Sequence, residues 1–149
     1  MTAKSRYDPE SVLPHRGRMV LLDTVEAWDG QSLIASVTIR PDSPFCGEAG
    51  VPGHIGIEYM AQACGAFAGV EAREAGERVR IGFLLGTRNC AIRRGWYRVG
   101  ERLTVSASLV YRDGQMANFD TRIEIAGESI AEARLTVYQP DMVAGEPRG

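Results

Sequence analysis

Apolar and polar side chains alternate along several stretches of this chain, which is the pattern of half-buried β-strands. Between residues 32 and 39 every second position is apolar, and the positions between them are mostly polar. The same alternation occurs in residues 102–111, 117–126 and 129–138, and shorter strand segments cover 25–28, 79–86 and 90–92. Two Asp-Gly pairs, Asp29-Gly30 and Asp113-Gly114, are typical of the tight turns that join hairpin strands. The pattern therefore predicts two strands in the first part of the chain and four or five in the second half.

Residues 53–75 have a different pattern, with apolar or small side chains on nearly every face of a helix. A helix that is hydrophobic all round is a buried helix. At roughly 20 residues, such a helix is about 30 Å long. Gly76 directly follows the segment and is a typical helix stop. We therefore expect one long helix buried inside the protein.

This order of elements predicts an α+β fold in which a curved antiparallel sheet wraps around one long central helix. Residues 1–149 are expected to form a single domain with a core of about 11–140. The first and last ten residues are polar and are expected to be frayed. One helix cannot cover a sheet of this size, and the outer strands keep an open edge. We therefore expect at least a dimer, joined through the sheet edge and the end of the helix.

Composition excludes several classes of function. The 149 residues carry a net charge of −2 without a dominant basic patch, so no nucleic acid is expected as a partner. The N-terminus is polar and the longest apolar stretch contains Glu58 and Gln62, so neither a signal peptide nor a membrane span is predicted. The three cysteines lack metal-ligand spacing, which favours reduced thiols in a cytoplasmic protein. No phosphate loop, zinc motif or Ser-His-Asp triad is visible, so no cofactor and no metal are expected.

Three segments carry motifs of a known family. They are residues 13–16 (L-P-H-R) with 19–23 (M-V-L-L-D), residues 51–63 (V-P-G-H-I-G-I-E-Y-M-A-Q-A), and residues 81–86 (I-G-F-L-L-G) through 99–101 (V-G-E). They resemble segments of the hot-dog-fold 3-hydroxyacyl-acyl-carrier-protein dehydratases, and are more similar to a divergent subgroup, the predicted dehydratases of aryl polyene synthesis. The resemblance covers roughly residues 11–139. It implies a hot-dog fold, an acyl-carrier-protein or coenzyme A thioester as substrate, and a homodimer, a higher homo-oligomer or pairing with another hot-dog dehydratase.

The loop before the helix departs from this family. There, a G-H-F-P-G type loop supplies a catalytic histidine that acts with the helix carboxylate across the dimer interface. Here the matching residues 44–50 (P-F-C-G-E-A-G) form a shorter loop without histidine. The chain has only two histidines, His15 and His54. The activity of the family therefore does not carry over through this loop.

Dehydration of a 3-hydroxyacyl thioester needs a base for the C2 proton and a donor for the leaving C3 hydroxyl, and imidazole suits both tasks. Glu58 is the first catalytic candidate, because burial in an apolar helix would raise its pKa and fit it for acid catalysis. The alternative for Glu58 is a structural charge at the helix N-terminus or a salt bridge. His54 lies four residues before Glu58 and would share a helix face with it, or would only line the entrance. His15 is the second histidine candidate, and a structural role in the L-P-H-R turn is favoured for it.

Three further residues are candidates for binding the substrate. Gly53 and Gly56 would let a thioester approach the helix N-terminus, whose N–H groups could stabilise negative charge on its carbonyl oxygen. Gln62 lies one turn beyond Glu58 and could hydrogen-bond the carboxylate or a water, with a polar contact across a dimer as the alternative. Arg88, Arg93, Arg94 and Arg98 could steer an acidic carrier protein, or be an ordinary solvated face.

Three functions follow from these residues. The leading hypothesis is a 3-hydroxyacyl-thioester dehydratase-like protein that acts in fatty acid or polyene type acyl chain synthesis. The second is an acyl thioesterase, in which Glu58 and a water would suffice. The third is a non-catalytic acyl-binding or partner subunit, which the missing loop histidine favours.

Overall fold

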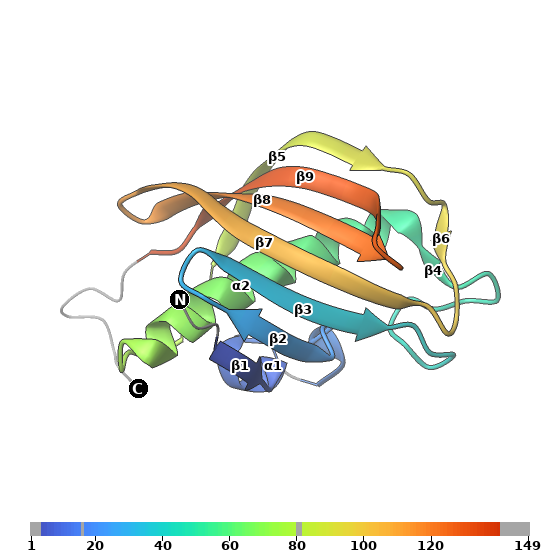
Figure 1. Ribbon diagram of the computed structural model, residues 1–149, viewed down its shortest axis with the longest axis horizontal. Helices are drawn as coiled ribbons and strands as arrows, with labels where there is room; N and C mark the ends of the chain where they lie inside the picture. The colour runs from blue at the N-terminus through green and yellow to red at the C-terminus, as the bar shows by residue number, and fades with distance from the viewer. Residues whose placement is uncertain (1–3, 16, 80–81, 141–149) are drawn as a thin grey trace.

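A curved antiparallel sheet wraps around one long helix, α2 (Gly56–Glu74), in the computed structural model (Figure 1). The structure describes residues 4–15, 17–79 and 82–140. Seven strands form the sheet, in the order β1 (Lys4–Tyr7), β2 (Thr24–Trp28), β3 (Ser32–Thr38), β7 (Arg102–Asp113), β8 (Met116–Ile125), β9 (Glu128–Tyr138) and β5 (Phe83–Ile92). All neighbouring strands pair antiparallel. The predicted α+β architecture of one sheet around one helix is therefore confirmed.

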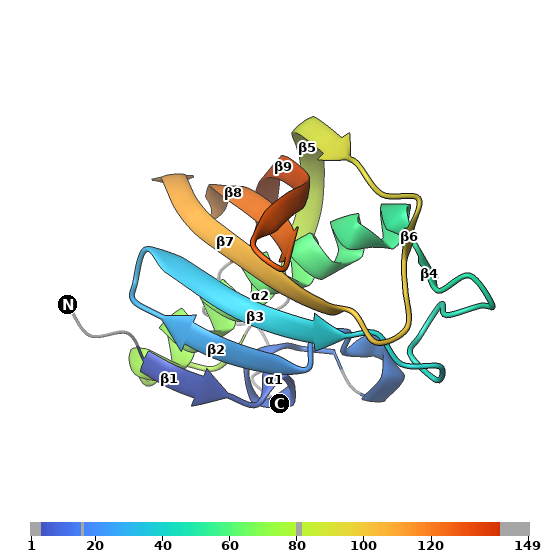
Figure 2. The same cartoon turned by 45° about the vertical axis from the view of Figure 1, so that its right-hand side comes forward.

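Short elements flank the central helix. At its N-terminal end, β4 (Val51–Pro52) pairs with β6 (Trp96–Tyr97), and the 3-10 turn η2 (Gly53–Ile55) leads directly into α2 (Figures 1 and 2). The helix α1 (Pro9–Val12) and the 3-10 turn η1 (Gly17–Met19) lie before β2 and carry the L-P-H-R segment between them. Among the described residues, no helix has the length and apolar character needed to cross a bilayer.

The N-terminal segment differs from the expectation of a frayed end. Residues 4–7 form the edge strand β1, which pairs with β2, and Asp8 caps α1 by accepting a hydrogen bond from the backbone N–H of Glu10. Main-chain pairing to β2 does not require apolar side chains, so the polar composition of this segment gave no signal of a strand. The expectation of a frayed C-terminus falls on residues 141–149, outside the described residues.

A single strand, β5 (Phe83–Ile92), replaces the two predicted at 79–86 and 90–92. Its pairing with β9 shifts register between Leu84 and Gly86 and again between Arg88 and Ala91. Asn89 adopts a left-handed backbone conformation at φ 53°, as irregular strand positions often do. These irregularities break the alternation that would have predicted one strand. Residues 80–81 of the expected segment lie outside the described residues.

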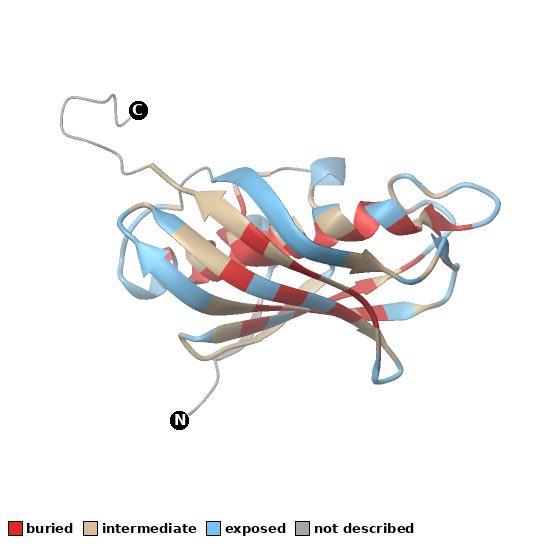
Figure 3. Cartoon of the chain, turned by 90° about the horizontal axis from the view of Figure 1, so that it is seen from above, coloured by how far each residue is buried: buried red, intermediate tan, exposed pale blue. Residues whose placement is uncertain are grey.

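The core lies between the concave face of the sheet and one side of α2. Figure 3 shows buried residues along the helix and at alternate positions of the strands. Phe67 packs edge-on against Phe119 of β8, with ring centroids 5.1 Å apart, and Leu33, Val105 and Leu135 bring aliphatic side chains from three strands. Each fully buried large apolar side chain contributes about 1.5–3 kcal/mol. This packing fixes the side of α2 that faces away from the sheet.

The side of α2 that faces away from the sheet is only partly buried, so the prediction of a helix buried on every face is wrong. Glu58 is exposed, and Ile57, Ala61, Gly65, Ala68 and Glu71 are only partly buried. They recur at three- and four-residue spacing, which places them on one stripe of the helix. The sequence pattern favours core positions for the small side chains among them, because size and hydropathy do not distinguish a core face from a face that lines a cavity.

Candidate functional site

The partly exposed stripe of α2 forms one wall of a cavity of about 220 Å³, here named the Glu58 cavity. Its other walls are the segment Pro14–His15 and the edge of the sheet, where Leu84 of β5 pairs with Val137 of β9. The lining includes Pro14, His15, Glu58, Ala61, Gln62, Gly65, Leu84 and Val137. The cavity therefore combines an apolar surface with a carboxylate, an imidazole and an amide.

Glu58 lies in the first turn of α2, where the partial positive charge of the helix terminus favours a carboxylate. The predicted burial of Glu58 is wrong for the single chain, in which the residue is exposed. It is exposed because it occupies the stripe of α2 that the sheet does not cover. Within the described part of the chain it forms no hydrogen bond or ion pair, so both carboxylate oxygens can bind a molecule in the cavity.

His15, and not His54, shares this cavity with Glu58. His15 is half-buried, and its Nδ1 atom is inaccessible to solvent. His54 is exposed, lies in η2, and is not among the residues that line the cavity. The α-helix begins at Gly56, two residues after His54, so the shared helical face expected for His54 and Glu58 does not form. The structure thus brings together one predicted histidine and the predicted carboxylate.

Gln62 holds the chain segment that follows His15. Its Nε2 donates to the carbonyl oxygen of Met19 at 2.6 Å, and its Oε1 accepts from the N–H of Leu21 at 2.8 Å. The side chain is buried, where leaving either group unpaired would cost about 1–3 kcal/mol. Both ends of the amide are therefore engaged with main chain. This pairing supports a role for Gln62 in positioning residues 19–21 against α2. Gln62 also lines the Glu58 cavity, and its contact with substrate stays a prediction.

Gly53 and Gly56 face β6 and its flanking residues, and neither lines the Glu58 cavity. A Cβ atom at Gly53 would lie 1.9 Å from the carbonyl oxygen of Arg94, and one at Gly56 would lie 2.4 Å from the Tyr97 hydroxyl. The N–H of Gly53 donates to the carbonyl oxygen of Gly95 at 2.7 Å. These glycines are therefore required by close packing, and Gly53 has no N–H available for the thioester oxygen that was expected to bind there.

Tyr97 is a buried residue that the sequence did not single out. Its hydroxyl donates to the carbonyl oxygen of Gly53 at 3.0 Å, which ties β6 to the turn preceding α2. Burial raises the pKa of Tyr97 to about 12, so the hydroxyl stays protonated and donates across the neutral range. An isolated Trp-Tyr pair after a glycine gave no sign of this contact, because its partner lies 44 residues away in the chain.

Ion pairs occupy part of the predicted arginine cluster. Arg94 contacts both carboxylate oxygens of Glu101, at 2.7 and 2.8 Å, and Arg93 lies 3.0 Å from Glu132. These contacts engage two of the four arginines with acidic residues of the same chain. Only part of the cluster therefore keeps its charge available for an acidic partner.

Comparisons with known proteins point to a dehydratase family. Residues 7–146 match the family model ApeP-like, described as ApeP dehydratase. Curated relatives include 3-hydroxyacyl-[acyl-carrier-protein] dehydratases FabZ from an Anaeromyxobacter strain, 30% identical, with 83% of this chain and 82% of that protein covered, and from Bartonella quintana, 28% identical, with 84% and 83% covered.

Solved structures give the same result. The dehydratase heterocomplex ApeI:P from Xenorhabdus doucetiae matches with a TM-score of 0.86 and 30% identity, over 91% of this chain and 93% of that chain. A hypothetical thioesterase with coenzyme A from Streptococcus pneumoniae, at 13% identity and a TM-score of 0.62 over 78% and 84%, shares the hot-dog fold alone. The match to the family model spans nearly the whole sequence, including the helix with Glu58 and the segment with His15. The chain therefore belongs to the ApeP-like dehydratase family.

Proposed function

We propose that this chain dehydrates 3-hydroxyacyl thioesters carried by an acyl carrier protein, in fatty acid or polyene type acyl chain synthesis, and that the Glu58 cavity is its active site. The observation that carries the proposal is the presence of His15 and Glu58 in one cavity of a chain from a dehydratase family. His15 takes the place of the histidine missing from residues 44–50. The FabZ relatives, named as 3-hydroxyacyl-acyl-carrier-protein dehydratases, support the choice of substrate.

The reaction divides between the two side chains. The neutral imidazole of His15 accepts the C2 proton of the substrate, and the electron pair of the C2–H bond forms the C2–C3 double bond. The C3–O bond breaks with its electron pair on oxygen, and the imidazolium of His15 gives the proton taken from C2 to the leaving hydroxyl, which departs as water. Glu58 binds this hydroxyl and orients it toward His15. The products are the enoyl thioester and water, and both side chains return to their starting protonation states.

An assay with the purified protein and a 3-hydroxyacyl thioester tests this function. The expected result is growth of enoyl thioester absorbance without release of free thiol. Release of thiol without the enoyl product would identify a thioesterase. Absence of both products would leave the chain as a non-catalytic acyl-binding subunit and would refute the proposed activity.

Pairing with a second hot-dog subunit is part of the proposal, and the exposed edge of the sheet supports it. β5 pairs only with β9 among the described strands, and residues 83–90 are all exposed. Phe83, Leu84 and Leu85 are 51%, 42% and 55% exposed, an unusual run of apolar surface for an unpaired strand. Because Leu84 also lines the Glu58 cavity, a subunit that covers β5 would also close this cavity and shield Glu58 from solvent. The similar protein described as a heterocomplex supports either a second copy or a related dehydratase as the partner.

Leu85→Glu is expected to weaken this association, because it places a charge in the apolar edge. Light scattering coupled to size exclusion should show a shift toward the mass of one chain, 16.2 kDa. The matched control is Val110→Glu, at a 45% exposed position of β7 away from the edge, which should leave the mass unchanged. If purified wild-type protein is a monomer, self-association is excluded, and co-purification with a related dehydratase subunit becomes the remaining test of pairing.

A further inference from the structure

We propose that the acyl chain of the substrate runs along α2 from the Glu58 cavity into a second cavity, and that the ion pair between Arg112 and Glu71 limits the chain length accepted. The proposal rests on the proposed function, since it assumes that the reacting carbons lie beside Glu58. It adds a determinant of specificity at the opposite end of the helix.

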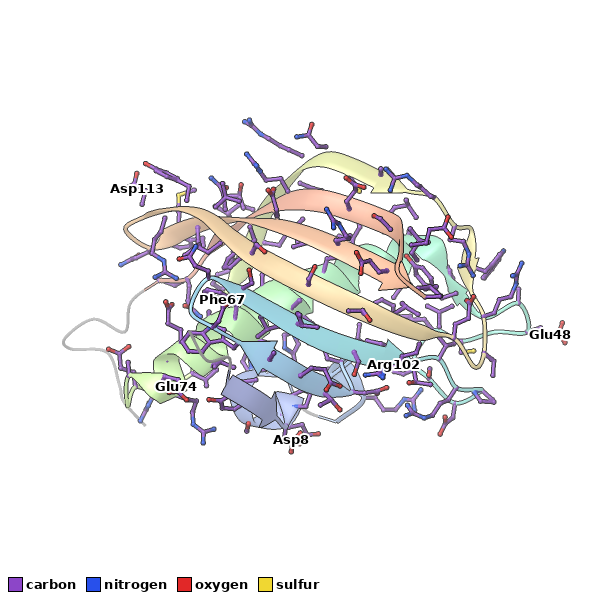
Figure 4. All side chains as sticks on the ribbon, in the orientation of Figure 1. Asp8, Glu48, Phe67, Glu74, Arg102 and Asp113 are labelled. Atoms are coloured by element: carbon purple, nitrogen blue, oxygen red, sulfur yellow. The ribbon has the colours of Figure 1, made fainter. Side chains whose placement is uncertain are left out.

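The second cavity lies beside the C-terminal half of α2 and has a volume of about 130 Å³. Cys64, Ala68 and Glu71 of the helix line it, together with Arg112 and Met116 from the β7–β8 hairpin. In Figure 4, Asp113 at the hairpin and Glu74 at the end of α2 both lie toward the left-hand end of the molecule. The hairpin therefore forms the wall farthest from Glu58.

The two cavities adjoin each other along the helix. Val137 of β9 lines both, and on α2 the lining passes from Gly65 in the first cavity to Cys64 and Ala68 in the second. Small side chains at Ala61, Gly65 and Ala68 leave room for a hydrocarbon chain close to the helix. The proposed path therefore passes from one cavity to the other beside Val137, the residue that lines both.

The length of this path suits a medium to long acyl chain. Glu71 follows Glu58 by 13 residues, which corresponds to roughly 20 Å along the helix axis. An extended chain of single bonds advances by roughly 1.3 Å per bond, judged from the 3.8 Å spanned by three backbone bonds. About fifteen carbons would therefore reach from one carboxylate to the other.

The ion pair forms a charged barrier at the end of the path. Arg112 donates from Nη1 to one carboxylate oxygen of Glu71 at 3.1 Å and from Nη2 to the other at 2.8 Å. An apolar chain end would have to displace water from these charges, and the free energy lost by desolvating them would exceed the free energy gained by burying the chain end. The pair is also half-exposed, at 42% and 37% for the two side chains, so its removal should leave the fold intact.

Arg112→Ala tests the proposal through the chain-length profile of dehydration. The ratio of kcat/KM for chains longer than about fifteen carbons to that for short chains should rise about tenfold, as expected if one or two more methylene groups are buried. The reversed pair, Glu71→Arg with Arg112→Glu, should restore the wild-type ratio. The matched control is Arg134→Ala, which removes a similar pair with Asp120 on the outer face of the sheet and should not change the ratio.

Val137→Phe tests the path from the other direction, since a larger side chain between the two cavities should lower the ratio of kcat/KM for long chains to that for short chains; an unchanged ratio would count against the path. Turnover of short chains by Arg112→Ala shows that this variant is folded and that the proposed function holds. An unchanged length profile in Arg112→Ala, together with normal short-chain turnover, would refute the further inference alone. Absence of dehydration in the wild-type protein would refute the proposed function instead.

Discussion

Replacing His15 with alanine is expected to lower kcat/KM for dehydration by about 100- to 10,000-fold, the range typical of a lost general base. The reason is its place in the cavity that also holds Glu58, where the proposed mechanism makes its imidazole the base that accepts the C2 proton. His54→Ala supplies the matched control, because His54 is the only other histidine and does not line this cavity. Its kcat/KM is expected to stay within about threefold of wild type, the level of a substitution outside the reacting centre.

Steady-state kinetics on both histidine variants provide the measurement, with circular dichroism as the check on folding. The hydrogen bonds that hold Gln62 go to main-chain groups of Met19 and Leu21 and do not involve either imidazole. Loss of activity in His54→Ala with full activity in His15→Ala would reverse the assignment. Full activity in both variants would exclude a histidine base.

Glu58→Gln is expected to lower kcat by a similar factor of about 100 to 10,000. The amide keeps the size of the carboxylate but cannot carry the negative charge with which Glu58 is proposed to bind and orient the leaving hydroxyl. The stability of the fold should change little, because Glu58 is exposed in the single chain and a charge at a helix N-terminus contributes only about 0.3–1 kcal/mol. Urea unfolding and kcat, measured on the same preparation, separate these two effects.

The matched control for Glu58→Gln is Glu48→Gln, at an exposed position of the loop that precedes β4. This variant should keep both the activity and the unfolding midpoint of the wild type. A Glu58→Gln enzyme that retained wild-type kcat would remove Glu58 from the mechanism. The Glu58 cavity would then be at most a binding site for the acyl chain.

Regular periodicity made most of the fold predictable. Alternation located β3, β7, β8 and β9 to within a few residues, since side chains of a strand with one buried face must alternate. The apolar segment at residues 53–75 likewise located α2. The sequence missed β1, because an edge strand can be held by main-chain hydrogen bonds that leave no hydrophobic pattern.

The candidate site was less predictable because its arrangement depends on long-range contacts. The choice between the two histidines depends on where α2 begins, and the turn before it is held by the Tyr97 hydroxyl from a distant strand. The partners of Gln62 are main-chain groups more than 40 residues away. Residue type and spacing identified Glu58 as ionisable in an apolar helix, but only the packed structure shows which face of that helix remains uncovered.

Isotope incorporation at C2 tests the central claim most directly, namely that His15 and Glu58 together form the dehydration site. The wild-type protein would be incubated with an enoyl thioester in D2O, and the hydrated product of the reverse reaction analysed by mass spectrometry and NMR. We expect one deuterium at C2 with wild type and His54→Ala, and none above background with His15→Ala or Glu58→Gln. Deuterium at C2 in all four proteins, at equal rates, would contradict the account.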